Sequence, residues 1–296
     1  MKLLKSPRLM LITAMSIFGT IGLFVRNIPV SSGELALYRA LLAILLLSLF
    51  LKITGQKIPF SNIKKEFPLL IVSGAAMGIN WILLFEAYKY TTVSTATLSY
   101  YFAPVIVTVV CPVLFREKLT GKQILCFFMS TLGLIMITGT GNIGGTAIDG
   151  SADLFGILFG LGAAVFYAGV ILLNKFIKNV EGIHRTFLQF LSAVVVLLPY
   201  VIMTGGTHLG QLNAIGWVNL LIVGLVHTGL TYCLYFSSLK ELPGQKAAIL
   251  SYVDPLVAVL ISVTILGETM TLWQVLGGIL ILGFTLWNEI GSSSQA

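Results

Sequence analysis

The sequence has few charged residues. Asp, Glu, Lys and Arg make up 10% of its 296 residues, whereas hydrophobic residues make up 57%. A soluble domain carries about 25% charged residues, and a single soluble core could not cover this much apolar surface. The composition therefore excludes an ordinary soluble globular protein and predicts a protein whose apolar surface faces lipid.

Cysteine is also scarce. The three cysteines, Cys111, Cys126 and Cys233, all lie inside apolar runs, and their number is odd. A disulfide framework needs paired cysteines, usually in exposed segments. We therefore interpret all three as small apolar packing residues.

Long hydrophobic runs are abundant, and ten of them are long enough to cross a bilayer. We expect helices, because lipid supplies no water to bond backbone groups, so each span must satisfy its own. The runs are too long and too continuously apolar for barrel strands. The first follows Lys2, Lys5 and Arg8 like a signal peptide, but it has no small-residue cleavage site, so we expect a retained span. The predicted spans are 9–25, 33–51, 67–87, 93–114, 122–139, 154–174, 184–203, 214–236, 246–266 and 271–288.

Positive charges are distributed unevenly over the connecting loops. With the N-terminus in the cytoplasm, 15 of the 18 lysines and arginines fall inside, Arg26 and Lys89 fall outside, and Arg39 lies within a span. Because cytoplasmic loops are enriched in Lys and Arg, we expect a multi-pass protein of the cell (plasma) membrane with both termini cytoplasmic. This distribution accounts for the net charge of +7 without a nucleic-acid partner.

The second half of the chain repeats the first at an offset of 151 residues. Residues 69–125 and 220–276 align without a gap and share 15 identities, including Tyr101 with Tyr252, Pro104 with Pro255, and Glu117 with Glu268. Each half has five spans, an odd number, so the second half must begin on the opposite side of the membrane. The sequence thus predicts an all-α integral membrane protein of ten transmembrane helices in two inverted five-helix repeats. Secondary transporters have this arrangement, with the substrate site between the halves near the midplane. The predicted divisions are 1–139 (first repeat), 140–153 (external linker), 154–289 (second repeat) and 290–296 (cytoplasmic tail).

The ends of the aligned region resemble a known family. The stretches REKLTGKQ (116–123) and GETMTLWQ (267–274) are similar to the paired signatures of the EamA-like family in the drug/metabolite transporter superfamily, although the first has Arg116 where glycine is usual. The alanine-rich helix entries with a mid-helix proline, at 96–104 and 247–255, resemble that family too, as does Arg39 early in the second span. The resemblance implies ten helices, cytosolic termini and transport of small metabolites, often outward. We therefore expect a secondary transporter and exporter of amino acids or related compounds. An importer of another metabolite remains an alternative.

Asp254 stands out because an ionised carboxylate deep in a span costs on the order of several kcal/mol unless it is paired or hydrated. The repeat places Ala103 at the matching position, so the helix itself does not require an acid. Pro255 beside it removes a backbone hydrogen bond and frees a carbonyl. Two interpretations remain open. Asp254 either bonds a neighbouring helix for structure, or binds substrate or a proton in a central cavity.

Other polar and aromatic residues in the spans are candidates for the same cavity. Arg39 either extends to the outer interface or points inward to pair with Asp254 or a substrate carboxylate. His227 either bonds across helices or carries protons. The remaining candidates share a helix face with other polar or aromatic residues, and the two prolines match each other in the repeat. The predicted site is Asp254, Arg39, His227, Asn80, Trp81, Tyr101, Tyr167 and Ser16, with Pro104 and Pro255 bending their helices.

Two other functional classes are weighed against a carrier. An enzyme is disfavoured because the G-x-S-x-G and H-E-x-x-H motifs are absent and only Asp254 among the carboxylates is deep in a span. A channel is disfavoured because nothing resembles a carbonyl filter, and kinked helices in an inverted repeat suit alternating access. We expect no metal and no cofactor. The expected partners are a small-molecule substrate and the lipid bilayer, with protons as a candidate coupling ion, in a monomer or a homodimer.

Overall fold

The structure is a computed structural model that describes residues 6–56, 60–115, 120–138, 150–180, 182–239, 242 and 250–291. Glu117, most of the predicted linker 140–153 and most of the predicted tail 290–296 lie outside these residues. Every regular element within them is a helix. The expected all-α fold is confirmed.

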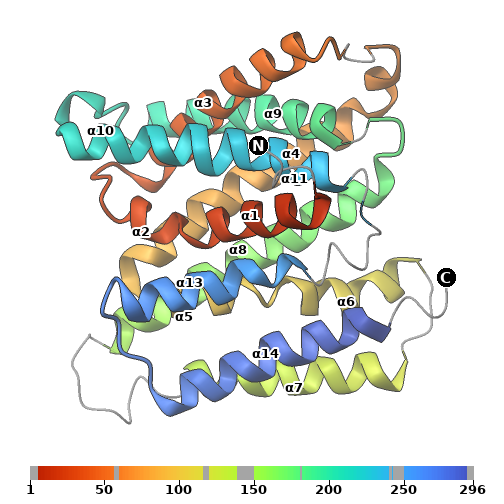
Figure 1. The fold of residues 1–296 in the computed structure, drawn as a ribbon, viewed down its shortest axis with the longest axis vertical. Coiled ribbons are helices and arrows are strands. Elements are labelled where there is room, and N and C mark those ends of the chain that lie inside the picture. Colours follow the sequence, from red (N-terminus) through yellow and green to blue (C-terminus); the bar gives the residue numbers. More distant parts are fainter. Residues whose placement is uncertain are drawn as a thin grey trace.

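The described residues of the first half form five helical segments, two of which are interrupted, and Figure 1 shows how they are arranged. The first segment is divided at Thr20 and the fourth at residues 101–102. The elements are α1 (Pro7–Gly19) with α2 (Ile21–Val25), α3 (Ser32–Ile53), α4 (Phe60–Tyr90), α5 (Val93–Tyr100) with α6 (Ala103–Phe115), and α7 (Gly121–Thr138).

The second half also contains five segments. Its third segment passes without a break from α-helix through a π-helical stretch and back to α-helix. The elements are α8 (Gly150–Phe176), α9 (Gly182–Met203), the short 3-10 helix η3 (Leu209–Gln211), α10 (Ala214–Leu221) with the π-helix η4 (Ile222–Leu230) and α11 (Thr231–Leu239), α13 (Val253–Thr264), and α14 (Leu272–Gly291).

These helices have the lengths and surfaces of membrane spans. Among the described residues, seven helical segments are long and apolar enough to cross a bilayer, and three shorter apolar helices complete the ten. On α3, Leu45 and Ile53 are 66% and 74% exposed, whereas Leu47 between them is fully buried. Such an exposed apolar face is stable only against lipid. With five crossings in each half, the second half starts from the opposite side of the membrane.

Glycines let the helices of the bundle approach closely. A Cβ at Gly74 in α4 would collide with the backbone oxygen of Gln189 in α9 and lie 2.5 Å from the Cβ of Ser192. A Cβ at Gly156 in α8 would lie 2.6 Å from the Cβ of Thr91. Both belong to G-x-x-x-G stretches, and close packing of small residues is how membrane helices associate. Both glycines therefore serve close helix packing.

The family-like signature has a structural role in both halves. At the start of α7, the Thr120 hydroxyl accepts from the Gln123 N–H at 3.2 Å, while the Gln123 side chain accepts from the Thr120 N–H at 2.8 Å. Thr271 and Gln274 make the same reciprocal pair at the start of α14, at 3.2 and 2.9 Å. This is a capping box, which satisfies two unpaired donors at a helix start. Thr120 and Thr271 therefore cap helices at equivalent positions of the two halves.

The helices capped in this way form a pair at one edge of the molecule (Figure 1). A Cβ on Gly133 of α7 would lie 2.9 Å from the Cβ of Leu280 in α14, so the two helices are in close contact. The remaining helices, α3, α4, α8, α9 and η4 among them, enclose the main hydrophobic core. The site described next lies among the central helices, away from the α7–α14 pair.

Candidate functional site

The two halves meet at a pair of interrupted helices. The fourth segment leaves helical geometry at residues 101–102, just before Pro104, and the ninth does so at Tyr252, just before Pro255. Proline lacks an N–H and collides with the carbonyl four residues back, which explains why both breaks precede it. Tyr101 in one break donates to a carboxylate oxygen of Asp254, in the first turn after the other, at 2.5 Å. Ser94 of α5 and Ser262 of α13 are hydrogen-bonded farther along the same helices, also at 2.5 Å.

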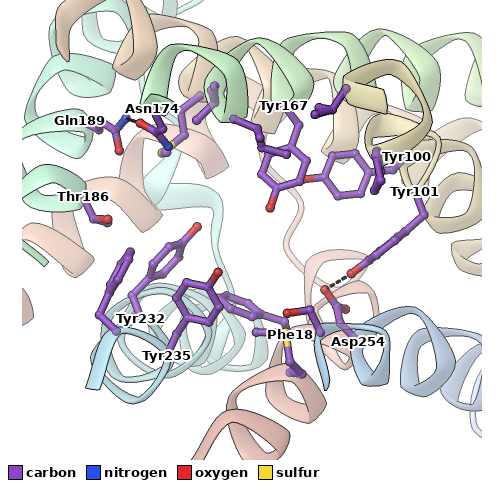
Figure 2. Close-up of a pocket in the computed structure, with 18 of the residues that line it drawn as sticks. Phe18, Tyr100, Tyr101, Tyr167, Asn174, Thr186, Gln189, Tyr232, Tyr235 and Asp254 are labelled. Carbon is purple, nitrogen blue, oxygen red and sulfur yellow. Dashed lines mark hydrogen bonds between the residues drawn. The ribbon is translucent and has the colours of Figure 1, made fainter. Parts of the chain in front are cut away.

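A cavity of about 450 Å³ lies beside this junction. Its walls come from both halves and are rich in aromatic rings, as Figure 2 shows. Tyr101 and Tyr100 stand at the end of α5, Tyr167 projects from α8, and Tyr232 and Tyr235 project from α11. The rings of Tyr100 and Tyr167 are 5.3 Å apart, within the range of a favourable aromatic contact. The cavity therefore offers flat apolar surface with hydroxyl groups at its edge.

A smaller chamber of about 120 Å³ continues from the main cavity. Six residues line both spaces: Phe18, Tyr100, Tyr101, Tyr167, Tyr232 and Asp254. Arg39, Asn80 and Trp81 line only the smaller chamber. Asp254 thus stands at the passage between the two spaces, and Arg39 stands beyond it.

Arg39 is fixed in place and is only 3% exposed. Its Nε donates to the Thr228 hydroxyl at 3.0 Å. Its guanidinium carbon lies 4.6 Å from the ring centre of Trp81 and 5.2 Å from that of Phe85, within cation–π range. The side chain therefore does not extend to the outer interface. It is not ion-paired with Asp254 either, since the described residues contain no ion pair of Arg39.

Polar groups gather at the other end of the main cavity. Gln189 of α9 donates to Ser73 at 2.5 Å and to the side chain of Asn174 at 2.7 Å, and Figure 2 shows the latter bond beside Thr186. Arg185 donates to the backbone oxygen of Asn174 at 3.3 Å. Asn174 and Arg185 lie close to the ends of α8 and α9. The cavity therefore reaches the end of the bundle at which most Lys and Arg residues of the sequence are expected.

Following the topology that the sequence predicts, we call the opposite end of the bundle the outer end and the former end the inner end. The outer end is closed by a polar cluster that we call the outer seal: Arg26, Thr91, Val93, Ser262 and Glu268. Arg26 forms an ion pair with Glu268 and donates to the Thr91 oxygen at 2.7 Å. Glu268 also accepts from the Val93 N–H at 2.9 Å and from the Ser262 hydroxyl. These bonds tie the ends of the first, fourth and ninth segments together. Glu268 therefore links three segments at this end of the bundle.

An outer vestibule of about 390 Å³ lies on the far side of this closure. Its walls include Arg26, Lys89 and Phe85. Tyr88 lines both this vestibule and the smaller chamber, so its side chain separates the two. The central space is closed towards the outer end and extends towards the inner end.

His227 lies outside the cavity. It is 1% exposed and belongs to η4. Its Nε2 is hydrogen-bonded to Thr20 at 2.8 Å, at the break between α1 and α2, and its Nδ1 to the oxygen of Ile222 at 3.3 Å. The structure thus gives His227 a bond across helices. In the same π-helix, Thr228 donates to Val223 five residues back and accepts from Arg39, so η4 supports the site indirectly.

The other predicted residues divide between wall and support. Asn80 and Trp81 line the smaller chamber, and Asn80 also donates to the oxygen of Ala163 at 2.6 Å. Pro104 lines the main cavity, whereas Pro255 is buried behind it. Ser16 borders neither space, whereas Met15 and Phe18 of the same helix line the main cavity.

Several lining residues were not predicted. Tyr232 stands at the repeat position of Trp81, an offset of 151 residues, so the repeat could have identified it. Gln189 could have been noticed as an amide in an otherwise apolar run. Tyr100 gave no such signal, because it reaches the cavity together with Tyr101 only through the helix break at residues 101–102. Arg185 gave none either, because it was counted among the loop charges.

Comparisons with known proteins agree with this architecture. The model of the EamA-like transporter family matches residues 6–139 and 154–288, one copy in each half. An uncharacterised transporter, YxxF, of Bacillus subtilis (strain 168) is 32% identical over 272 residues, covering 92% of this chain and 85% of the relative. An uncharacterised inner membrane transporter, YicL, of Salmonella typhimurium (strain LT2) is 29% identical over 275 residues, covering 90% and 88%. A solved crystal structure that is 15% identical superposes with a TM-score of 0.67 over 98% of this chain and 99% of the other, which shows a shared fold.

Proposed function

Because this chain belongs to the EamA-like transporter family, we propose that it exports amino acids or related small compounds from the cell by alternating access. It is a multi-pass membrane transporter and not an enzyme. Family membership establishes a transporter, and we propose in addition its substrate class, its direction and its mechanism.

One observation carries the proposal. A central cavity lies between the two halves, sealed towards one end of the bundle by the Arg26–Glu268 cluster and extending to the other end past Asn174 and Arg185. A carrier that exposes its site to one side at a time needs such an arrangement. A channel would need a continuous path.

The sidedness rests on charge. Most Lys and Arg residues fall at the end towards which the cavity extends, and we assign this end to the cytoplasm. We propose that both termini are cytoplasmic, that the first repeat spans 1–139, and that 140–153 is an external linker before the second repeat at 154–289. In this orientation the described conformation faces inward, ready to take up a cytoplasmic substrate.

The lining supports a small amphipathic substrate. Ligand sites are mostly apolar with a few well-placed polar groups, and here tyrosine rings surround Asp254 and Arg39. Asp254 at the passage between the two spaces is the group we propose for substrate binding or for proton coupling.

Counterflow in vesicles tests the proposal. Purified protein is first screened against metabolites for thermal stabilisation, because a ligand that binds the folded state raises its stability. Vesicles loaded with the unlabelled ligand are then diluted into a trace of labelled ligand. A carrier accumulates the label transiently and shows saturable flux. Simple equilibration would indicate a channel, and chemically altered ligand would indicate an enzyme.

A further inference from the structure

Arg39 has an unusual environment for a charged residue in a membrane span. It is nine-tenths or more buried, its Nε is bonded to Thr228, and aromatic rings cover it. Arg39 also lines the smaller chamber. A buried charge without a partner is expensive, whereas a well-bonded one is tolerated.

The carboxylates that the structure describes are engaged elsewhere. Glu34, Glu86 and Glu268 pair with His208, Lys89 and Arg26. Glu66 accepts from the backbone N–H groups of Lys178 and Asn179, Asp153 accepts from Thr91, and Asp254 accepts from Tyr101. Within the described part of the chain, Arg39 therefore has no anionic partner, although it lines an open space.

We propose that the smaller chamber is a carboxylate site, in which Arg39 binds the carboxylate of a zwitterionic substrate while Asp254 faces its ammonium group; this rests on the transport function proposed above. The guanidinium fork matches a carboxylate in geometry and charge. Asp254 lines the same chamber and is the acidic group in it. The tyrosine-lined main cavity takes the apolar or aromatic remainder of the molecule.

The depths of the two charges give the substrate an orientation. Arg39 is the eighth residue of α3, about 10 Å along the helix from its outer end. Asp254 lies ten residues before the outer end of α13, about 15 Å from that end along the helix. Arg39 borders only the smaller chamber, whereas Asp254 borders both spaces and is met first from the main cavity. The substrate enters from the main cavity and places its carboxylate foremost.

The same pair of charges selects against other ligands. Arg39 and Asp254 cancel, so the site presents no net charge of its own. A molecule with two negative charges would meet Asp254, and a purely cationic molecule would meet Arg39. Unfavourable charge pairs of this kind give specificity by penalising the wrong ligand.

Three probes with one ring and different charges test the assignment. L-Phenylalanine has both charges, L-phenylalaninamide keeps the ammonium group, and 3-phenylpropanoate keeps the carboxylate. Their affinities are measured by titration calorimetry on the purified full-length protein. The parent is expected to bind L-phenylalanine more tightly than either of the other two.

Variants separate the two ends of the site. Arg39→Gln is expected to weaken the binding of L-phenylalanine and 3-phenylpropanoate by about tenfold or more, as loss of a charged hydrogen bond should. L-Phenylalaninamide, no longer opposed by the Arg39 charge, should bind this variant as tightly as the parent or more tightly. Asp254→Asn is expected to weaken L-phenylalanine and L-phenylalaninamide instead. Arg39→Lys keeps the charge without the fork and should fall between the parent and Arg39→Gln. Lys52→Gln, on the exposed inner end of α3, is the matched loss of charge outside the site and should change nothing.

Four results would overturn this assignment: equal weakening of all three probes in Arg39→Gln, no weakening at all, a parent that prefers a probe with a single charge, or a parent that binds none of the probes. If such a protein still shows counterflow of another metabolite, the transport function stands and only the zwitterion site is lost. If no compound shows counterflow, the transport proposal itself fails.

Discussion

Asp254 is the residue at which the two halves of the molecule touch across their breaks. It lies in the first turn of α13, where unpaired backbone N–H groups favour a negative charge. It accepts a hydrogen bond from Tyr101 in the break of the other half. Asp254 therefore does bond a neighbouring helix, as the structural interpretation requires. It also lines both spaces of the cavity, which a purely structural acid would not need to do.

The variant Asp254→Asn separates these roles, because the amide keeps the shape and can still accept from Tyr101. We expect the protein to fold while losing substrate binding or the dependence of flux on a pH gradient. Flux in proteoliposomes, measured with and without an imposed gradient, is the readout. Glu86→Gln serves as the control for loss of a carboxylate, because Glu86 pairs with Lys89 and lines neither cavity space. Parent-like flux in Asp254→Asn under both conditions would make the aspartate structural only.

Charge isolated in an apolar run was the most informative signal at this scale. It singled out Asp254 and Arg39, and the structure places both on the cavity wall. The same signal singled out His227, which the structure places outside both spaces and bonds across helices to Thr20. Around His227 the chain is a π-helix, in which hydroxyls of Thr228 and Thr231 bond carbonyls five residues back. The wider winding changes which residues share a face.

At the scale of the helix, the breaks and the close contacts position the site. The prolines and the Thr-x-x-Gln caps could be found in the sequence because each acts on its own backbone. The interruption of the first segment at Thr20 and the π-helix could not, because they are joined to each other by the Thr20–His227 bond. A contact between residues 207 positions apart leaves no local pattern.

The contact between α4 and α9 supports the polar mouth of the cavity. A Cβ at Gly74 would meet the backbone of Gln189, whose side chain bonds Ser73 and Asn174. Overpacking of a tight contact costs about 1–3 kcal/mol. Gly74→Ala should therefore lower the melting temperature of the purified protein.

Gly283→Ala in α14 is the matched control, because a Cβ there meets no atom within 4 Å. Alanine also favours a helix over glycine by about 1 kcal/mol, so this variant should be neutral or stabilising. Equal melting temperatures for Gly74→Ala and the parent would show that the two helices can separate freely, against the close packing described here.

At the scale of the whole molecule, the sequence was sufficient for the architecture. The ten spans followed from hydrophobic length, and the two halves followed from an offset at which Tyr, Pro, Glu, Thr and Gln recur. The cavity did not follow in the same way, because it depends on how ten helices pack. That packing brings residues as distant as Tyr101 and Asp254 together.

Topology is the first prediction at this scale. Single cysteines at Gly144, in the predicted linker, and at Ser293, in the predicted tail, should react with an impermeant thiol reagent from opposite faces of the membrane. The physical reason is that five spans separate them. Labelling of both from the same face would rule out the inverted arrangement.

The central claim is that one cavity is reached from one side at a time, with the Arg26–Glu268 cluster closing the outer end. Ala258 lines the smaller chamber, so a cysteine placed there, in a protein without Cys111, Cys126 and Cys233, reports which side reaches the site. An impermeant thiol reagent applied to each face of the membrane in turn is the measurement. We predict that Ala258→Cys is labelled mainly from the cytoplasmic face, and that adding Glu268→Gln raises labelling from outside while lowering labelling from inside. Equal labelling from both faces, unchanged by Glu268→Gln, would contradict the account and indicate an open channel.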